Sequence, residues 1–166
     1  MSLLFAAIGA TLTALFEVTV VPYLAVGDAK PHPVLVIGVI WTIAAGIDRG
    51  VVWAFVGGLF LDALTGRPLG ASAFSLLVAV GAARILMQPL GRLRTLLPVV
   101  AVPILSLLYS MLIFVLISAT RPDITVADPI GRFVSGAIYD GVLGLLIGPL
   151  AISIHDRRAS VERVDW

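Results

Sequence analysis

The chain has 166 residues, of which 60% are hydrophobic and 13% are charged, whereas soluble domains carry roughly 25% charged residues. So few charges cannot cover a water-facing surface of this size, which excludes a free soluble domain and indicates an integral membrane protein. The net charge of +1 gives no basic footprint for nucleic acid, and the lack of cysteine excludes disulfides, thiolate nucleophiles and cysteine-bound metals.

Six apolar stretches follow one another along the chain and predict an all-α integral membrane protein with six transmembrane helices. They are residues 3–26, 33–47, 50–65, 70–88, 95–120 and 132–154. We expect the whole chain, residues 1–166, to form one polytopic membrane domain, with 155–166 as a cytoplasmic tail. A count of four is the alternative, if the short second and third stretches form one re-entrant hairpin.

The distribution of Lys and Arg predicts the orientation of these spans. With six spans, seven basic residues share the side of both termini and four lie on the other side, so both termini are expected in the cytoplasm. The first stretch has no basic start and contains Glu17, so we expect a retained span and no cleaved signal peptide. The smaller basic group, on the outer side, is Lys30, Arg67, Arg121 and Arg132.

Three acids interrupt the apolar stretches, namely Glu17, Asp62 and Asp140. A charge in hydrocarbon is costly, so intramembrane acids usually face protein or water and often serve function. The helical rise places all three in the outer half of the bundle, and the basic side chains nearest in sequence belong to the outer loops. The alternatives to a functional role are contact with headgroup water or Arg67 for Asp62, a buried structural hydrogen bond for Asp140 and a protonated, inert side chain for Glu17.

Small residues recur every four positions around two of these acids, which places each set on one helix face. The third stretch carries Gly50, Ala54, Gly58, Asp62 and Gly66, and the sixth carries Arg132, Gly136, Asp140, Gly144 and Gly148. Such faces let membrane helices approach closely, either within the bundle or against another protein. The second interpretation predicts partner contacts at Gly58, Asp62, Gly66, Pro68, Gly70, Gly136, Asp140 and Gly144.

Catalytic constellations are missing from the sequence. His32 and His155 fall on opposite sides of the membrane and cannot share a metal or a proton relay, and the serines lack a nearby base. We therefore expect no enzyme, no cofactor and no metal site. Two further classes stay open beside a partner-binding protein. One is a small-molecule-binding subunit with an outward pocket, and the other is an ion-coupled transporter that uses the three acids.

Residues 51–70 carry the most specific pattern in the chain. A glycine-rich span contains Gly58, Leu59 and Asp62, and a small-residue turn then ends in Pro68-Leu69-Gly70. This segment resembles the core of the rod shape-determining protein MreD family, in which Gly-Leu-x-x-Asp precedes a turn ending Pro-Leu-Gly.

The resemblance extends over residues 31–90. Upstream, Lys30-Pro31-His32-Pro33-Val34-Leu35 is similar to the Pro-Asp/Asn-Leu sequence that starts the second helix in that family. His32-Pro33 departs from this pattern, and Glu17 lies where a glutamine is common.

Family resemblance implies a fold and a role. MreD-like proteins belong to the cell-elongation machinery of the bacterial inner membrane, which maintains rod shape and peptidoglycan synthesis. They bind the single-span protein MreC and, through it, connect MreB with RodA and a class B penicillin-binding protein. Their fold resembles the six-helix substrate-binding subunits of energy-coupling-factor transporters. We therefore expect a non-catalytic scaffold that binds MreC, with a vitamin-type binding subunit of a membrane transporter as the alternative.

Overall fold

The computed structural model describes residues 3–27, 29–88, 96–120 and 129–161, and within these ranges the chain is all-helical. Its elements are α1 (Leu3–Thr19), the 3-10 helix η1 (Val21–Leu24), α2 (Pro33–Ala45), α3 (Ile47–Thr65), α4 (Ala71–Met87), α5 (Leu97–Thr120) and α6 (Pro129–Val161). The prediction of six helices is confirmed. Two of them, α5 and α6 as far as His155, are long and apolar enough to cross a membrane. The shorter apolar helices α1, α2 and α4 are likewise consistent with a multi-pass membrane protein.

The two largest differences between predicted and observed boundaries lie at the end of the first stretch and at the end of the sixth. The first stretch was expected to continue to Val26, but α1 ends at Thr19 and η1 follows, because Pro22 has no N–H group for a continuing α-helix. At the other end of the chain, α6 begins already at Pro129 and continues to Val161. The first part of the predicted tail therefore prolongs α6, and residues 162–166 lie outside the described part of the chain.

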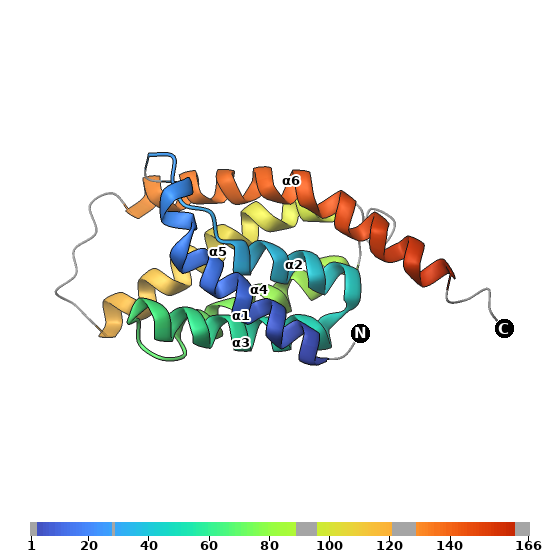
Figure 1. Cartoon of the computed structure of the whole chain (residues 1–166). Helices are drawn as coiled ribbons and strands as arrows, with labels where there is room; N and C mark the ends of the chain where they lie inside the picture. Colours follow the sequence, from blue (N-terminus) through green and yellow to red (C-terminus); the bar gives the residue numbers. More distant parts are fainter. Residues whose placement is uncertain (1–2, 28, 89–95, 121–128, 162–166) are drawn as a thin grey trace.

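The two ends of the bundle can be distinguished by what lies there. At one end, termed the η1 end, α1 ends, α2 begins and α5 gives way to α6 (Figure 1). The chain also turns from α3 into α4 there. The opposite end, termed the terminal end, holds the start of α1 and the far end of α6 (Figure 1).

The short helix α2 lies at the centre of the bundle, between α1 and α6 in the view of Figure 1. It contacts every other α-helix. Its side chains are apolar apart from the hydroxyl of Thr42 and the indole N–H of Trp41. A helix that is apolar on all faces belongs in an interior. With 13 residues against the 24 of α5, α2 is about 20 Å long and α5 about 36 Å. The start of α2 therefore lies inside the bundle.

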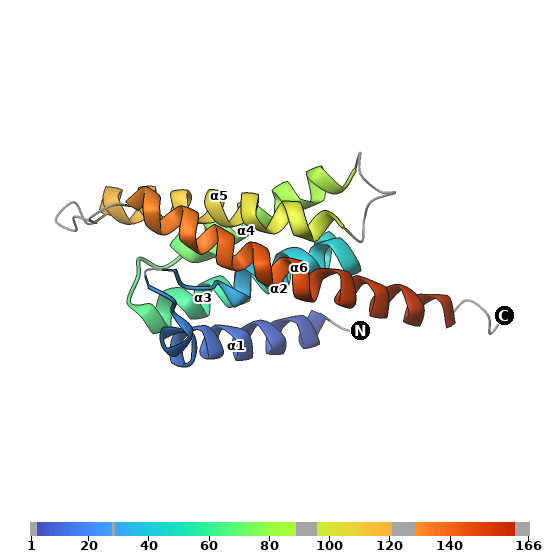
Figure 2. The same cartoon turned by 90° about the horizontal axis from the view of Figure 1, so that it is seen from above.

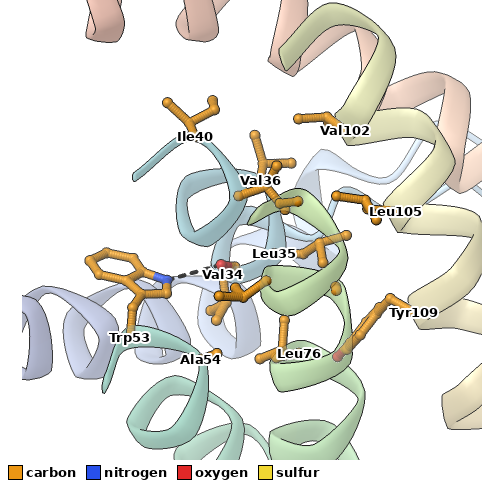
Figure 3. Close-up of a cluster of buried hydrophobic side chains, with 14 of the residues drawn as sticks. Val34, Leu35, Val36, Ile40, Trp53, Ala54, Leu76, Val102, Leu105 and Tyr109 are labelled. Carbon is orange, nitrogen blue, oxygen red and sulfur yellow. Dashed lines mark hydrogen bonds between the residues drawn. The ribbon is translucent and has the colours of Figure 1, made fainter. Parts of the chain in front are cut away.

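The core forms where α2 meets α3, α4 and α5. Val34 and Leu35 of α2 pack with Leu76 of α4 and Leu105 of α5 (Figure 3). Trp53 of α3 is 2% exposed, and its indole N–H donates to the Val34 carbonyl oxygen at 3.0 Å (Figure 3). Burial of such large side chains contributes most of the stability of the bundle interior.

Candidate functional site

Asp62 caps the start of α4 although it belongs to the last turn of α3. Its fully buried carboxylate accepts the N–H groups of Gly70 at 2.8 Å and Ser72 at 2.9 Å. The first N–H groups of a helix have no partner within that helix, and a negative charge is favourable beside them. Gly70, at the N-cap position, has no side chain for this task. Asp62 therefore replaces a local cap.

Two glycines make this arrangement possible. Gly66, which follows α3, has φ of 64°, and Gly70, which precedes α4, has φ of 96°. Most side chains are strained in this left-handed region, whereas glycine is not. The N–H groups of Gly66 and Arg67 both return to the Asp62 carbonyl oxygen. The spacing of Asp62, Gly66 and Gly70 thus reverses the chain and caps the next helix in one device.

Glu17 and Asp140 perform the same task for α2 from two other helices. The Val34 N–H donates to Glu17 Oε2 at 2.9 Å, and the His32 N–H donates to Asp140 Oδ1 at 2.7 Å. Asp140 also meets His32 Nδ1 at 2.9 Å and accepts the Ser106 hydroxyl at 2.6 Å, both through Oδ2. This fully buried carboxylate therefore joins α2, α5 and α6 at one point.

The ring of His32 lies in the loop just ahead of α2, with its side chain 24% exposed. Burial lowers the pKa of this imidazole, but the hydrogen bond and charge of Asp140, together with the charge of Glu17, outweigh that effect. The pKa of His32 is therefore raised above its usual 6.5. When it is protonated, the ring forms an ion pair with Asp140 beneath the η1 end.

A cavity of about 470 Å³ lies beside this polar cluster at the η1 end. Basic side chains and an apolar wall from α5 and α6 contribute to it, and the described lining contains no acid. The Tyr109 ring forms part of the wall and meets the His32 ring edge-on at 5.5 Å between centroids. The lining residues are Lys30, His32, Arg67, Tyr109, Ser110, Ile113, Phe114, Ile117, Ser118, Arg132 and Phe133.

A second hollow, termed the α2 groove, follows α2 beside α6, with α1 forming part of its wall nearer the η1 end and Arg49 of α3 part of its wall at the other end. It consists of two cavities of about 410 Å³ and 360 Å³ that share Ile37 and Ile147. The cavity nearer the η1 end is lined by Leu12, Thr13, Phe16, Leu24, Pro31, Pro33, Val36, Ile37, Tyr139, Leu143 and Ile147. The other is lined by Ile37, Ile40, Trp41, Ala44, Ala45, Arg49, Ile147, Ala151, Ile154 and His155.

Both small-residue faces pack against helices of the same chain. A β-carbon on Gly58 of α3 would lie 2.5 Å from the Ala73 nitrogen of α4, and one on Gly144 of α6 would lie 2.9 Å from Val102 Cβ of α5. A β-carbon on Gly136 would lie 3.6 Å from His32 Cε1, which is an ordinary van der Waals distance. This arrangement agrees with the interpretation that the small-residue faces pack helices within the bundle.

Partner contact at the predicted residues stays a prediction. Gly58, Asp62, Gly136, Asp140 and Gly144 are buried, whereas Gly66 is exposed and Pro68 and Gly70 are half-buried. Substitution of any of these five buried residues would therefore affect binding of another protein only indirectly.

The three acids do not converge on one site. Glu17 and Asp140 meet at the start of α2, while Asp62 serves α4. Contact with Arg67 was one alternative for Asp62, but Asp62 binds backbone N–H groups, and Arg67 Nη1 donates to the Ser72 hydroxyl at 3.2 Å. Within the described ranges, no three His, Asp or Glu side chains are placed to hold a metal.

Sequence reasoning missed three residues of the cluster. In the sequence, His32 stands out as a departure from the family pattern and as a histidine without a second histidine nearby, whereas its place between two prolines at a helix start indicates a capping position. Ser106 and Tyr109 were overlooked within an apolar stretch. Their spacing of three places them on one face of α5, and a polar pair on one face of a membrane helix is the signal that could have found them.

The all-helical fold and its apolar helices are consistent with a multi-pass membrane protein. The family model described as rod shape-determining protein MreD matches residues 1–129. The chain therefore belongs to the MreD family, a family of shape-determining membrane proteins not known as enzymes. The match includes α1 to α5 and the whole Asp62 turn. No curated protein and no solved structure matches the chain.

Proposed function

We propose that this chain is a non-catalytic scaffold of the bacterial cell-elongation machinery that binds the single-span protein MreC. The observation that carries the proposal is the family match over residues 1–129, which implies a rod shape-determining role. Through MreC the scaffold connects MreB with RodA and a class B penicillin-binding protein during peptidoglycan synthesis. In the proposed placement the whole chain is one domain in the cytoplasmic membrane. Both termini are cytoplasmic and the η1 end faces outward.

The α2 groove supports binding of a single helix. It follows α2 for about 20 Å, and most of its lining is apolar, as a lipid-immersed helix requires. Small side chains at Thr13, Ala44, Ala45 and Ala151 permit a close approach. An added helix would pack against α2 and α6 along the groove, and also against α1 in the half nearer the η1 end.

The residues predicted to contact a partner receive a revised role in this proposal. Gly58 and Asp62 fix α3 against α4, and Asp140 and Gly144 fix α6 against α2 and α5. Asp140 and Gly144 act on MreC through the position of α6, which borders the groove, whereas Gly58 and Asp62 stabilise the fold. The exposed turn at Gly66, with Pro68 and Gly70, is the part of this set that a partner segment can touch directly.

Single-cysteine cross-linking tests the groove as the MreC surface, because the chain has no cysteine of its own. The Ile147→Cys variant places a thiol in the groove, where the native side chain is 41% exposed. The matched control, Val115→Cys, places one on α5 at a residue that is 59% exposed and lies outside the groove. We expect a thiol-directed photo-cross-linker to give an MreC adduct with the first variant only. Adducts of equal yield, or an adduct with the control alone, would contradict the proposed surface.

A small-molecule-binding subunit of a membrane transporter is the second candidate, and the 470 Å³ cavity at the η1 end is the observation that favours it. The corresponding proposal for the fold is a six-helix arrangement like that of the substrate-binding subunits of energy-coupling-factor transporters. Native mass spectrometry in mild detergent separates the two candidates. A stoichiometric water-soluble ligand together with a transporter subunit favours the second, and a complex with MreC favours the first.

A further inference from the structure

We propose that the cavity at the η1 end binds the phosphate headgroup of an anionic phospholipid, with the acyl chains leaving along α5 and α6. This inference concerns a different surface from the α2 groove, and it stands whether or not MreC binds there. Three independent features of the cavity support it, and they are its charge, an unsatisfied hydroxyl and its apolar wall.

The charge of the lining favours an oxyanion. Lys30, Arg67 and Arg132 contribute to it, although Arg132 also has an interaction within the chain and the His32 ring is paired with Asp140. Among the described residues, Asp140 and Glu17 lie outside the lining and are engaged with the start of α2. A guanidinium has five N–H donors that match phosphate oxygens well. The bond from Arg67 to Ser72 uses one of those donors.

The Tyr109 hydroxyl supplies the second observation. Tyr109 is 2% exposed and extends from α5 toward α4, and its hydroxyl has no hydrogen-bond partner in the described structure (Figure 3). A buried hydroxyl without a partner is costly, so it points to an acceptor that completes the site. The Ser72 and Arg67 side chains lie beside this hydroxyl, but neither meets the geometry of a hydrogen bond with it. An oxyanion held by Arg67 supplies the acceptor that this hydroxyl lacks.

The apolar wall selects a lipid over a water-soluble anion. Ile113, Phe114 and Ile117 of α5 face Phe133 of α6 across the cavity lining, and the Phe114 and Phe133 rings meet edge-on at 5.6 Å. Inorganic phosphate gains nothing from such a wall, whereas acyl chains bury apolar surface against it. The cavity also lies at an end of an apolar bundle, where lipid headgroups are found. An acidic peptide would satisfy the cations but not this wall.

Lipid titration of the purified protein by native mass spectrometry tests the inference. Phosphatidylglycerol, phosphatidylcholine and inorganic phosphate are compared as probes. We expect phosphatidylglycerol to occupy one saturable site more tightly than either of the others. Arg67→Gln and Tyr109→Phe should each weaken it about tenfold, as expected for one hydrogen bond to a charged group. The matched control Arg84→Gln removes an exposed cation from the last turn of α4 and should leave binding unchanged.

Four outcomes overturn the inference. They are equal phosphatidylglycerol binding by the wild type and the Arg67→Gln variant, equal loss in the Arg84→Gln control, inorganic phosphate binding as tightly as the lipid, and binding of a glutamate-rich peptide without binding of lipid. Thermal unfolding of each variant accompanies the titration. If Arg67→Gln lowers the midpoint, Tyr109→Phe decides the question, because it removes a single oxygen atom that makes no hydrogen bond within the described structure.

Discussion

The starts of α4 and α2 use the same device over very different distances along the chain. Asp62 reaches N–H groups eight and ten residues ahead, within one helical hairpin. The carboxylates at the start of α2 come from 17 and 108 residues away. In both places a buried acid replaces a missing local cap and meets the positive end of a helix. The α4 cap therefore needs only its own turn, whereas the α2 cap needs the assembled bundle.

Depth explains why α2 needs acids at all. Asp140 lies about 16 Å along α6 from Pro129, so the His32 N–H that it accepts is far from the end of the bundle. Each unsatisfied backbone group is costly in an apolar interior, and the two acids supply the acceptors. The intramembrane acids are thus explained by the short central helix.

The largest effect is expected from Asp140→Leu, because this substitution leaves the His32 N–H, the His32 ring and the Ser106 hydroxyl without their acceptor. Breaking a buried charged pair costs about 3–5 kcal/mol, and unfolding in detergent should report a loss of that size. The control Asp140→Asn keeps one acceptor oxygen and should lose less. A midpoint equal to the wild type for Asp140→Leu would refute the long-range cap.

Removal of the local cap should cost less. Asp62→Ala leaves the Gly70 and Ser72 N–H groups unpaired at the η1 end of α4, for which we expect a loss of about 2–3 kcal/mol. The same unfolding measurement applies, with Asp48→Ala as control, since Asp48 is exposed in the first turn of α3. A larger loss from Asp62→Ala than from Asp140→Leu would reverse the proposed order of the two caps.

Close packing behind the Asp62 turn gives the third prediction. Gly58→Ala places a β-carbon against the backbone of Ala73 and should destabilise the bundle by about 1–3 kcal/mol. Gly81→Ala in α4 is the matched control, because nothing lies within 4 Å of its β-carbon position. Alanine favours a helix over glycine, so the control should be neutral or stabilising. Equal losses in both variants would show that the α3–α4 contact is looser than described.

The smallest effect concerns pH and belongs to the α2 start alone. Since the pKa of His32 is raised in the folded protein, its contribution to stability is complete below pH 6.5 and is lost as the pH rises through the higher folded value. Unfolding midpoints measured across that range should fall for the wild type. They should fall less for the His32→Gln variant. A wild-type midpoint that rises with pH would contradict the prediction.

The contrast between the local α4 cap and the long-range α2 cap also explains which features could be predicted from the sequence. The Asp62, Gly66 and Gly70 spacing is local, so the turn and the family could be predicted from a short segment. The roles of Glu17 and Asp140 could not, because α2 is short and enters the bundle between helices far apart in the chain. The partners His32 and Ser106 are brought to Asp140 only by folding. Spacing also could not decide which surface each small-residue face meets.

One paired measurement tests the central claim that the α2 groove binds MreC while the caps stabilise the fold. MreC co-purification and the thermal midpoint are determined together for Ile147→Trp, Val115→Trp and Asp62→Ala. The account predicts that Ile147→Trp loses MreC at an unchanged midpoint, that Val115→Trp keeps both, and that Asp62→Ala lowers the midpoint but keeps MreC per folded molecule. Retention of MreC by Ile147→Trp, or its loss from folded Asp62→Ala, would contradict the claim.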